Sequence, residues 1–193
     1  EIRRAGRCDC RIVIKQAERP QISSPDLWLL FAPVKKARLD FIAQKASEMG
    51  CSRIWPVRTE NCQVSRVNDD RMLANVIEAA EQTERLDIAE VMPFTDLAMA
   101  LDSCETHRNI IFCDEAIAGD AGMNAVRVLT DAAPISHAAV VIGPEGGFSK
   151  AERAMISARQ NSLKLSLGPR ILRADTAAIA ALTCFQSVCG DWT

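Results

Sequence analysis

The stretch Ala138-Ala139-Val140-Val141-Ile142-Gly143-Pro144-Glu145-Gly146-Gly147-Phe148-Ser149 says most about the fold of this chain. It opens with a continuous apolar run, 138–142, which is typical of a strand buried on both faces of a sheet. A glycine-bearing loop ends the strand. Ser149 and Glu152 then have the spacing of a capping box, which predicts a helix over 149–160. The stretch therefore predicts a buried strand, a glycine loop and a helix in succession.

The same arrangement occurs again toward the C-terminus, and strands and helices alternate along the rest of the chain. A strand predicted over 162–167 runs into Gly168-Pro169-Arg170 and is followed by an alanine-rich helix predicted over 177–188. Further strands are predicted over 11–14, 27–32, 53–57, 88–92 and 109–113, and helices over 36–49, 71–84, 95–101 and 122–131. A polar linker is expected over 16–25. This alternation predicts an α/β fold, with a mostly parallel sheet and helices on both faces.

The two glycine-bearing strand ends, 143–147 and 167–173, are expected to be two walls of one ligand site. Ligands of parallel α/β sheets bind at the carboxyl ends of the strands. Glycines there let backbone N–H and C=O groups approach a ligand closely. Tight turns without a ligand are the alternative, which two such loops, each followed by charged residues and a helix, make less favoured. The spacing fits neither a dinucleotide fingerprint nor a P-loop, so the residues indicate only a small ligand held by backbone groups.

Composition limits the classes of protein to which the chain can belong. It has 193 residues, of which 48% are hydrophobic and 25% charged, as expected for one globular domain, or for one domain with a fragment of another. No apolar run is long enough to span a bilayer and no signal peptide appears, so we expect a cytoplasmic protein without membrane contact. The net charge of −2 argues against a general polyanion binder. Basic clusters still leave local RNA contacts open, at Arg3, Arg4, Arg7 and Arg11 and at Lys35, Lys36 and Arg38.

The eight cysteines are expected to be buried, reduced thiols. No CxxC pair occurs, and His107 and His137 lie far in sequence from any cysteine pair. This spacing argues against a zinc site and against a disulfide framework, and no metal is expected. The two histidines are expected to be ordinary loop residues.

Both glycine loops and their flanks resemble the RsmE family of methyltransferases. The resemblance rests on Ile142-Gly143-Pro144-Glu145-Gly146-Gly147-Phe148-Ser149-x-x-Glu152 and on Leu165-x-Leu167-Gly168-x-Arg170-Ile171-Leu172-Arg173-x-Asp175-Thr176-Ala177. The segments 44–50 and 78–85 are also similar to that family, so the resemblance runs from about Trp28 to Gln186. Its members are SPOUT-class enzymes that methylate N3 of one uridine in 16S ribosomal RNA of the bacterial small subunit.

The resemblance implies an architecture that periodicity alone does not indicate. It implies a SPOUT domain with a C-terminal trefoil knot that binds S-adenosylmethionine (SAM), and a homodimer that completes the active site. It also implies an N-terminal PUA-like β-barrel for RNA binding. Only the tail of such a barrel fits here, so the chain is expected to be truncated at its start. We expect residues 1–20 to be a barrel remnant with its linker, and 21–193 to be the methyltransferase domain.

The resemblance also implies roles for individual residues. The cofactor is expected among Ile111, Phe112, Ile142, Gly143, Gly147, Leu165, Leu167, Gly168, Ile171, Leu172 and Thr176. Uracil N3 carries a proton, and its loss leaves negative charge on the ring oxygens. Arg173 and Arg170 are therefore candidates to stabilise that charge. Glu145 is the candidate base, or it orients an arginine or braces its loop. Gln82 and Arg85, expected to share a helix face, reach either RNA or neighbouring strand ends.

Two positions depart from the family pattern, and other functions stay open. Asp175 stands where the family usually has Glu, and Asn61 stands where Arg is common, which puts an RNA contact at Asn61 in doubt. One alternative is a SPOUT enzyme that methylates a ribose 2′-hydroxyl or another base. Another is a non-catalytic RNA-binding assembly factor. A nicotinamide-binding domain fits less well, because the glycine spacing is wrong.

Overall fold

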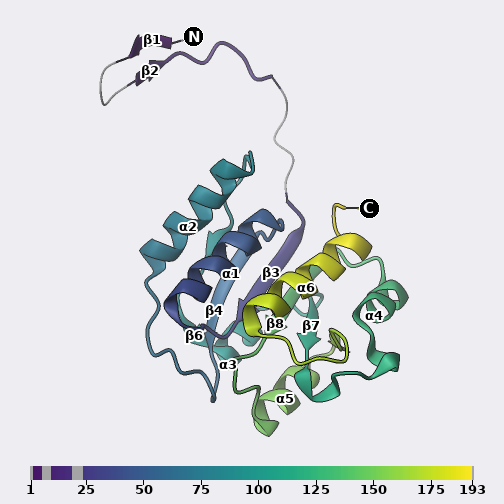
Figure 1. Cartoon of the computed structure of the whole chain (residues 1–193). Helices are drawn as coiled ribbons and strands as arrows, with labels where there is room; N and C mark the ends of the chain where they lie inside the picture. The colour runs from purple at the N-terminus through teal and green to yellow at the C-terminus, as the bar shows by residue number, and fades with distance from the viewer. Residues whose placement is uncertain (1, 6–9, 19–23, 193) are drawn as a thin grey trace.

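The computed structural model describes residues 2–5, 10–18 and 24–192. Near the N-terminus, β1 (Ile2–Ala5) pairs antiparallel with β2 (Cys10–Ile12), and this two-stranded sheet is separate from the main one (Figure 1). The strand predicted over 11–14 corresponds to β2, which begins one residue earlier and is shorter than predicted. The boundary expected at residue 20 lies outside the described residues, so the division into a barrel remnant and a methyltransferase domain stays a prediction.

The main sheet is parallel in every pairing and confirms the predicted α/β fold. Its strands are β3 (Asp26–Phe31), β4 (Arg53–Arg58), β5 (Glu90–Val91), β6 (Thr95–Asp96), β7 (Asn109–Cys113), β8 (His137–Ile142) and β9 (Ser162–Leu165). They lie in the order β5-β4-β3-β8-β7-β9, and β6 also pairs with β4. From β3 the chain first builds toward β5, and the later strands extend the sheet on the other side. The order therefore reverses between β3 and β8.

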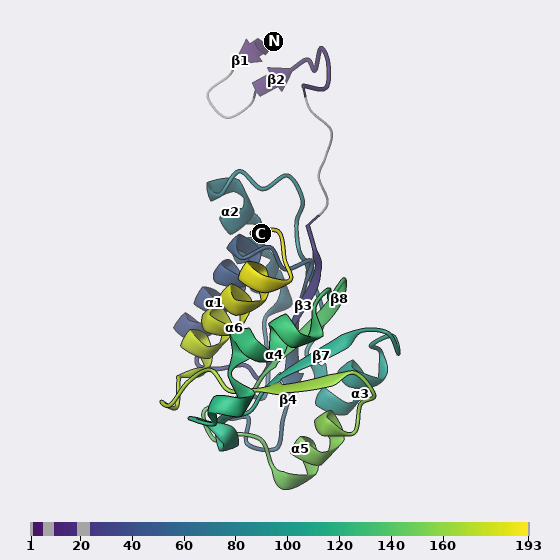
Figure 2. The ribbon, with the colours of Figure 1, turned by 90° about the vertical axis from the view of Figure 1, so that its right-hand side faces the viewer.

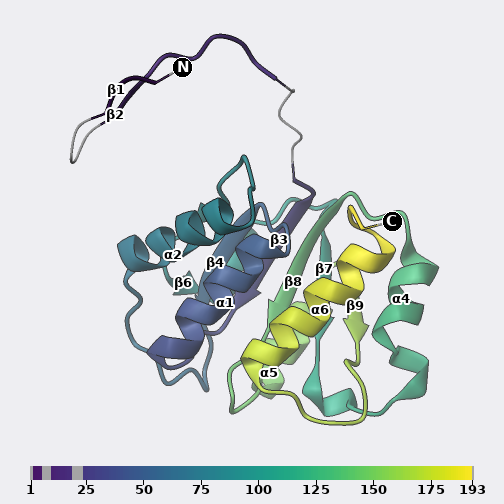
Figure 3. The same cartoon turned by 45° about the horizontal axis from the view of Figure 1, so that its top comes forward.

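Helices cover both faces of this sheet. They are α1 (Lys36–Glu48), α2 (Asp69–Gln82), α3 (Leu97–Asp102), α4 (Ala125–Ala132), α5 (Lys150–Ser157) and α6 (Ala174–Val188), with short 3-10 helices η1 (Glu115–Ile117) and η2 (Ala121–Met123). Figure 2 shows α1, α4 and α6 on one side of the sheet and α3 and α5 on the other, and Figure 3 shows α2 beside α1. Two separate apolar cores follow. One contains Phe31, Ile42 and Phe185, and the other contains Trp28, Trp55 and Ile156.

The buried strands read as apolar runs because both of their faces are covered. In β8 every residue after His137 is buried, and β3 is buried from Leu27 onward. Successive side chains alternate between the two cores: Leu27, Leu29 and Phe31 belong to one, and Trp28 and Leu30 to the other.

Element ends differ from the predictions where pairing or capping overrides periodicity. Residues 95–96 form β6 rather than the start of a helix, because they pair with the end of β4. The predicted helix over 122–131 begins only after Asn124, whose side chain accepts a hydrogen bond from Arg127 N. The last helix begins at Ala174, three residues before the predicted start. The capping box of Ser149 and Glu152 is present.

The described cysteines are free, but not all are buried. Cys51 and Cys113 are buried, four others are partly buried, and Cys10 is exposed, so the expectation of buried thiols is wrong for Cys10. Cys8 lies outside the described residues. Within the described ranges, no helix is long and apolar enough to cross a membrane. The pairing of strands does not address the trefoil knot, which stays a prediction.

Candidate active site

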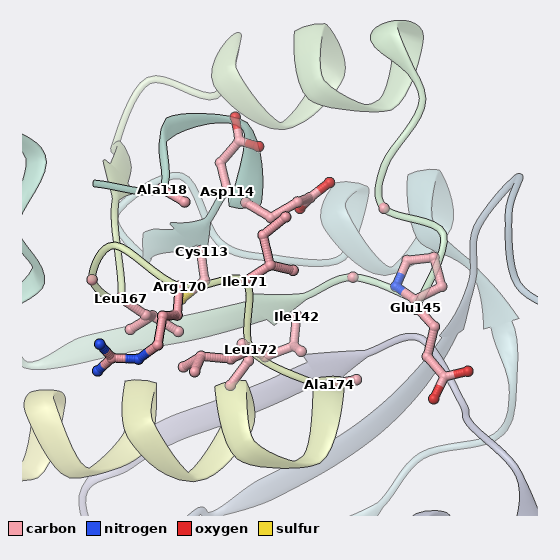
Figure 4. A pocket seen from close by; sticks show the side chains of 16 residues that line it. Cys113, Asp114, Ala118, Ile142, Glu145, Leu167, Arg170, Ile171, Leu172 and Ala174 are labelled. Carbon is pink, nitrogen blue, oxygen red and sulfur yellow. The ribbon is translucent and has the colours of Figure 1, made fainter. Parts of the chain in front are cut away.

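The two glycine loops line one cavity at the carboxyl ends of β7, β8 and β9. Its empty volume is about 620 Å³, within the range of small-molecule sites. One wall is the loop after β8 and another is the loop after β9, and the end of β7 lies between them because β7 pairs with both strands (Figure 4). The lining residues are Cys113, Asp114, Glu115, Ala118, Ile142, Gly143, Pro144, Glu145, Gly147, Leu167, Gly168, Arg170, Ile171, Leu172, Ala174 and Ala177.

Seven of the eleven expected cofactor residues line this cavity: Ile142, Gly143, Gly147, Leu167, Gly168, Ile171 and Leu172. The other four do not. Ile111, Phe112 and Leu165 are buried in the cores beneath it, and Thr176 is an exposed residue of α6. On β7 the lining begins at Cys113, one residue after the expected pair. On α6 it is Ala174 and Ala177, one helical turn apart, that face the cavity.

The expected set lacks the segment that follows β7. Cys113, Asp114, Glu115 and Ala118 line the cavity, and nothing in their local pattern marks them. The signal that could have found them is the strand order. Once β7 is known to lie between β8 and β9, its end must lie between the two glycine loops.

The loop after β8 is held by contacts from two directions. Gly147 has φ +70°, a conformation that L side chains rarely adopt, and a Cβ atom there would overlap the carboxylate of Glu115, so glycine is favoured at this position. From the other side, Asn61 Nδ2 donates to the carbonyl oxygens of Gly146 at 3.2 Å and Gly147 at 2.9 Å. Glu152 Oε1 also accepts from the backbone N–H of Glu60 at 2.7 Å, which ties the segment after β4 to the start of α5.

The loop after β9 leaves open space beside its backbone. Gly168 has φ +110°, and a Cβ atom built there would meet no heavy atom within 4 Å. Its N–H donates to Ser166 Oγ at 3.3 Å, and its carbonyl oxygen accepts from Gly119 N at 3.0 Å. Ile171, although apolar, is 77% exposed at the rim of the cavity. This wall combines accessible backbone with an apolar surface.

An acidic cluster lies at the end of β7. The side chain of Asp114 is fully buried and forms ion pairs with Arg153 and with Lys164, the latter at 2.8 Å. Arg153 also pairs with Glu115 and donates from Nε to Phe148 O at 3.1 Å. The two cations balance the carboxylates and hold α5 and β9 against the cavity. Because these charges balance one another, the cluster makes this wall polar without giving it a net charge.

The three catalytic candidates are not all brought together. Glu145 forms an ion pair with Arg38, and Arg38 Nε also lies 3.8 Å from Asp175 Oδ2. Arg173 does not line the cavity; it is exposed at the start of α6, between Leu172 and Ala174, which do line it. Arg170 lies at the opposite end, and Figure 4 shows its side chain pointing away from Glu145. Within the described part of the chain, neither Arg170 nor Arg173 has a side-chain hydrogen bond or ion pair.

Comparison with known proteins identifies the family. Residues 22–186 match the model of the RNA methyltransferase domain family. The ribosomal RNA small subunit methyltransferase E of Rickettsia conorii is 30% identical over 184 residues, covering 94% of this chain and 72% of that protein. The chain belongs to the ribosomal RNA small subunit methyltransferase E family.

Solved structures of the family agree with this assignment. The enzyme from Neisseria gonorrhoeae, bound to SAM, matches with a TM-score of 0.75 and 28% identity over 89% of this chain and 70% of that one. A methyltransferase from Legionella pneumophila in complex with SAM matches with a TM-score of 0.72 and 32% identity, covering 89% and 70%. The fold is that of the SPOUT methyltransferases.

The side chain of Arg85 is buried in the protein interior and is not placed to contact RNA. Its guanidinium donates to Ser47 O at 2.6 Å, to Cys51 O at 2.8 Å and to Ser24 Oγ at 2.9 Å, and it pairs with Asp87. Helix α2 also ends at Gln82, so Gln82 and Arg85 do not share a helix face. Two alternatives were open for Arg85. The structure supports its contact with neighbouring strand ends, and the expected contact with RNA is wrong. Gln82 is exposed, and its contact with RNA stays a prediction.

The expectation for His137 also needs correction. It begins β8 rather than lying in a loop, and its Nδ1 lies 2.7 Å from Asp26 Oδ2. Its ring packs edge-on against that of His107 at 4.7 Å. Arg108, buried at the same end of the sheet, pairs with Asp26. Desolvation raises the pKa of Asp26, but the hydrogen bonds and charges of Arg108 and His137 outweigh it and lower this pKa to about 2. These contacts lie at the amino ends of β3 and β8, away from the cavity.

Proposed function

We propose that this chain transfers a methyl group from SAM to N3 of a uridine in 16S ribosomal RNA. Family membership makes it a SAM-dependent ribosomal RNA methyltransferase. One observation carries the more specific proposal. The two family loops line a single cavity that has open space beside Gly168 and the Glu145–Arg38 ion pair at one end, and Arg173 lies in sequence between two residues of its lining, Leu172 and Ala174.

The residues of the cavity fit the chemical parts of SAM. Ile142, Leu167 and Leu172 supply apolar surface for adenine, and the open space beside Gly168 leaves room for its edge. The exposed carboxylate of Glu145 suits a positively charged ligand, whereas those of Asp114 and Glu115 are balanced by Arg153 and Lys164. When bound, SAM supplies an electrophilic methyl group, which N3 takes as the carbon–sulfur bond breaks and its electron pair stays on sulfur. Among the described residues, no group of three or more possible metal ligands is found.

The chain has to supply a proton acceptor and a stabilising charge. The uracil must be unpaired, because N3 lies on its Watson–Crick edge. Glu145 lies at the cavity end, and only its Oε1 pairs with Arg38, so Oε2 is the candidate to take the N3 proton. The negative charge then spreads over the ring oxygens. Arg173, exposed at the start of α6 with no side-chain partner among the described residues, is the candidate to stabilise it.

The proposal includes the surroundings of the enzyme. Its relatives are named for the small ribosomal subunit, which supports 16S rRNA within that particle as the substrate and a cytoplasmic location. A homodimer that completes the site, the trefoil knot and the absence of a metal and of a membrane partner belong to the same proposal. Arg170, at the far end of the cavity, contributes to cofactor binding or to a neighbouring subunit in this scheme.

The role of Arg173 predicts that Arg173→Ala lowers kcat about 10²- to 10³-fold while the Kd for SAM stays unchanged, because the guanidinium acts only on the charged base. Methyl transfer to undermethylated small-subunit particles measures the rate, and calorimetry measures the Kd. Arg127→Ala, which removes an exposed arginine of α4, is the matched control.

Two outcomes would contradict the proposal at different points. If the Kd for SAM rises by the same factor as the rate falls, Arg173 is a cofactor ligand and not a charge stabiliser. If mass spectrometry of the digested RNA finds 2′-O-methylated or another modified nucleoside instead of N3-methyluridine, the acceptor is wrong. Absence of SAM binding by the wild-type chain would favour a non-catalytic assembly factor.

A further inference from the structure

A second cavity adjoins the first and shares two of its wall residues, Pro144 and Glu145. Its empty volume is about 460 Å³. Three loops enclose it: the one after β3, the one after β4 and the one after β8. The lining residues are Pro33, Val34, Lys35, Asn61, Gln63, Val64, Pro144, Glu145 and Gly146. Of these residues, Glu145 was expected as a catalytic candidate and an RNA contact was left open at Lys35, whereas Gln63 was not singled out.

This cavity lies where open α/β sheets usually bind their ligands. Pro33, Val34 and Lys35 follow β3, and Pro144 follows β8, and these two strands are neighbours. Strand order reverses between them. In open α/β sheets, ligands bind outside the carboxyl ends of the strands at such a reversal. The first cavity lies one step away, over β8, β7 and β9, so both ligands meet at the loop after β8.

The walls of the second cavity suit a planar polar ring. Pro33, Val34, Val64 and Pro144 supply apolar faces, and Asn61, whose amide holds Gly146 and Gly147, forms a fixed wall. Gln63 is exposed, and within the described ranges its amide has no hydrogen-bond partner. An amide offers both a donor and an acceptor, which matches the N3–H and carbonyl groups of uracil.

Positive charge continues outward from this cavity. Lys35 lines it and has no side-chain partner in the described part of the chain. A third hollow, of about 800 Å³ of empty space, shares Val34 and Val64 with the second and carries Arg66 and Arg71. Arg71 is held by Asp40, with 2.9 Å between Nε and Oδ1, whereas Arg66 is exposed and its side chain has no hydrogen bond or ion pair with any described residue. A phosphate backbone that leaves the second cavity would thus meet Arg66.

We infer that the second cavity is the acceptor site, which takes an unpaired uridine of single-stranded RNA. Gln63 reads the edge of the base, and Lys35 and Arg66 bind the phosphates next to it. The inference rests on the proposed function, and it places the base against Glu145 and Pro144, the residues that also border the cofactor cavity. Family membership alone does not say where on the surface the uridine binds. The inference names this place and gives Gln63 as the residue that recognises the base.

Kinetics of the full chain on undermethylated small-subunit particles test the inference. Gln63→Ala is expected to lower kcat/KM for the particle about 10- to 100-fold, in the range of a lost base contact. Lys35→Ala is expected to raise KM and to reduce the salt dependence of binding by about one phosphate contact. The Kd for SAM should stay unchanged in both. Gln160→Ala and Lys150→Ala, exposed residues that line none of the three cavities, are the matched controls.

A second measurement does not depend on methyl transfer. A short single-stranded RNA with 4-thiouridine as its only uridine is photo-crosslinked to the wild-type chain, and the tryptic peptides are analysed by mass spectrometry. The expected crosslink is on the peptide 59–66, which contains Gln63 and lies between two arginines. Crosslinks confined to other peptides, or none, would overturn the inference. So would a Gln63→Ala enzyme whose kcat/KM is within twofold of the wild type.

The proposed reaction and the proposed acceptor site can be tested separately, because each fails with a different result. If the proposed reaction is wrong, the wild-type chain makes no N3-methyluridine, whatever its crosslinks are. If only the acceptor site is wrong, the wild type makes that nucleoside, while the crosslinks fall elsewhere. If Gln63→Ala weakens SAM binding as much as it lowers the rate, the second cavity belongs to the cofactor and the inference fails.

Discussion

Asn61 shows how one side chain can set the shape of a cavity that it does not line. Its amide nitrogen donates to both Gly146 O and Gly147 O, so it fixes the two peptide units at the turn of the loop after β8. It also forms part of the neighbouring acceptor cavity. A longer, charged arginine at this position would serve a different purpose. In this chain the residue acts as a positioning residue for the cofactor loop.

Removing this amide predicts a measurable loss of cofactor affinity. Asn61→Ala should raise the Kd for SAM about 5- to 10-fold, because two hydrogen bonds that preorganise the loop, worth about 1 kcal/mol net in total, are lost. Isothermal calorimetry measures this Kd. Asn161→Ala is the matched control, since its amide also donates to a backbone carbonyl, Thr106 O at 2.9 Å, but outside the cavities. Equal effects of both variants would contradict a specific role of Asn61.

At the scale of elements, the segment after α2 is fastened to the end of α1 and to Cys51, before β4, by one buried guanidinium, that of Arg85. The helix ends at Gln82, Glu84 takes the left-handed conformation with φ 58°, and Arg85 then reaches Ser47, Cys51 and Asp87. Only 10% of the Arg85 side chain is exposed. Its hydrogen bond lowers the pKa of Asp87 to about 2. This pair fixes how the chain passes from α2 to β5.

The lowered pKa predicts an acid-dependent contribution to stability. Because the folded-state pKa lies below that of the unfolded chain, about 3.9, the contribution is fully present above pH 5 and is lost as the pH falls toward 2. Asp87→Asn should therefore reduce the free energy of unfolding by about 1 to 2 kcal/mol at pH 6, after allowing for partial exposure. Urea unfolding at a series of pH values should show the difference from the wild type shrinking below pH 4.

The control for this prediction is Asp131→Asn, which removes an exposed carboxylate paired with Arg127 at 3.9 Å. It should change the free energy of unfolding by less than about 0.5 kcal/mol at every pH. A difference between wild type and Asp87→Asn that is constant from pH 6 to pH 2 would contradict the proposed ion pair.

The local sequence pattern predicted the strands and helices well, but it did not predict the contacts between them. Apolar runs located β3, β7 and β8 within a residue, and the capping box located α5. The lining of β7 was missed by one residue, because which of Phe112 and Cys113 borders the cavity depends on where the neighbouring strands end. The contacts of Arg38 and Asn61 were not predicted for a similar reason. Their partners lie 107 and 85 or more residues away, and no periodicity encodes such a contact.

At the scale of the whole molecule, segments far apart in sequence meet at one edge of the sheet. The cofactor cavity draws on 113–118, 142–147 and 167–177, and the acceptor cavity on 33–35, 61–64 and 144–146. The strand order brings them together, and the sequence predicts parallel strands without predicting that order. The barrel remnant, the knot and the homodimer were drawn from family resemblance and stay predictions.

Because the cofactor cavity joins distant segments, SAM is expected to slow hydrogen exchange in all of them at once. Amides of 143–149, 167–173 and 114–119 should gain protection on binding, while those of α3, on the far side of the sheet and away from the cavity, should not. Mass-spectrometric hydrogen exchange with and without saturating SAM measures this. Protection limited to one of the two glycine loops would contradict a shared cavity.

The loop after β8 is the one segment that belongs to both cavities, and this gives the enzyme a means of ordering its two ligands. When SAM binds, it meets the conformational entropy cost of ordering Pro144, Glu145 and Gly146. RNA that binds afterwards does not meet this cost again. The two affinities are then thermodynamically coupled, and each ligand strengthens the other by the same factor. The cofactor that has given up its methyl group has also lost its sulfonium charge, so we expect it to be held less firmly beside Glu145 and the modified RNA to be released more easily.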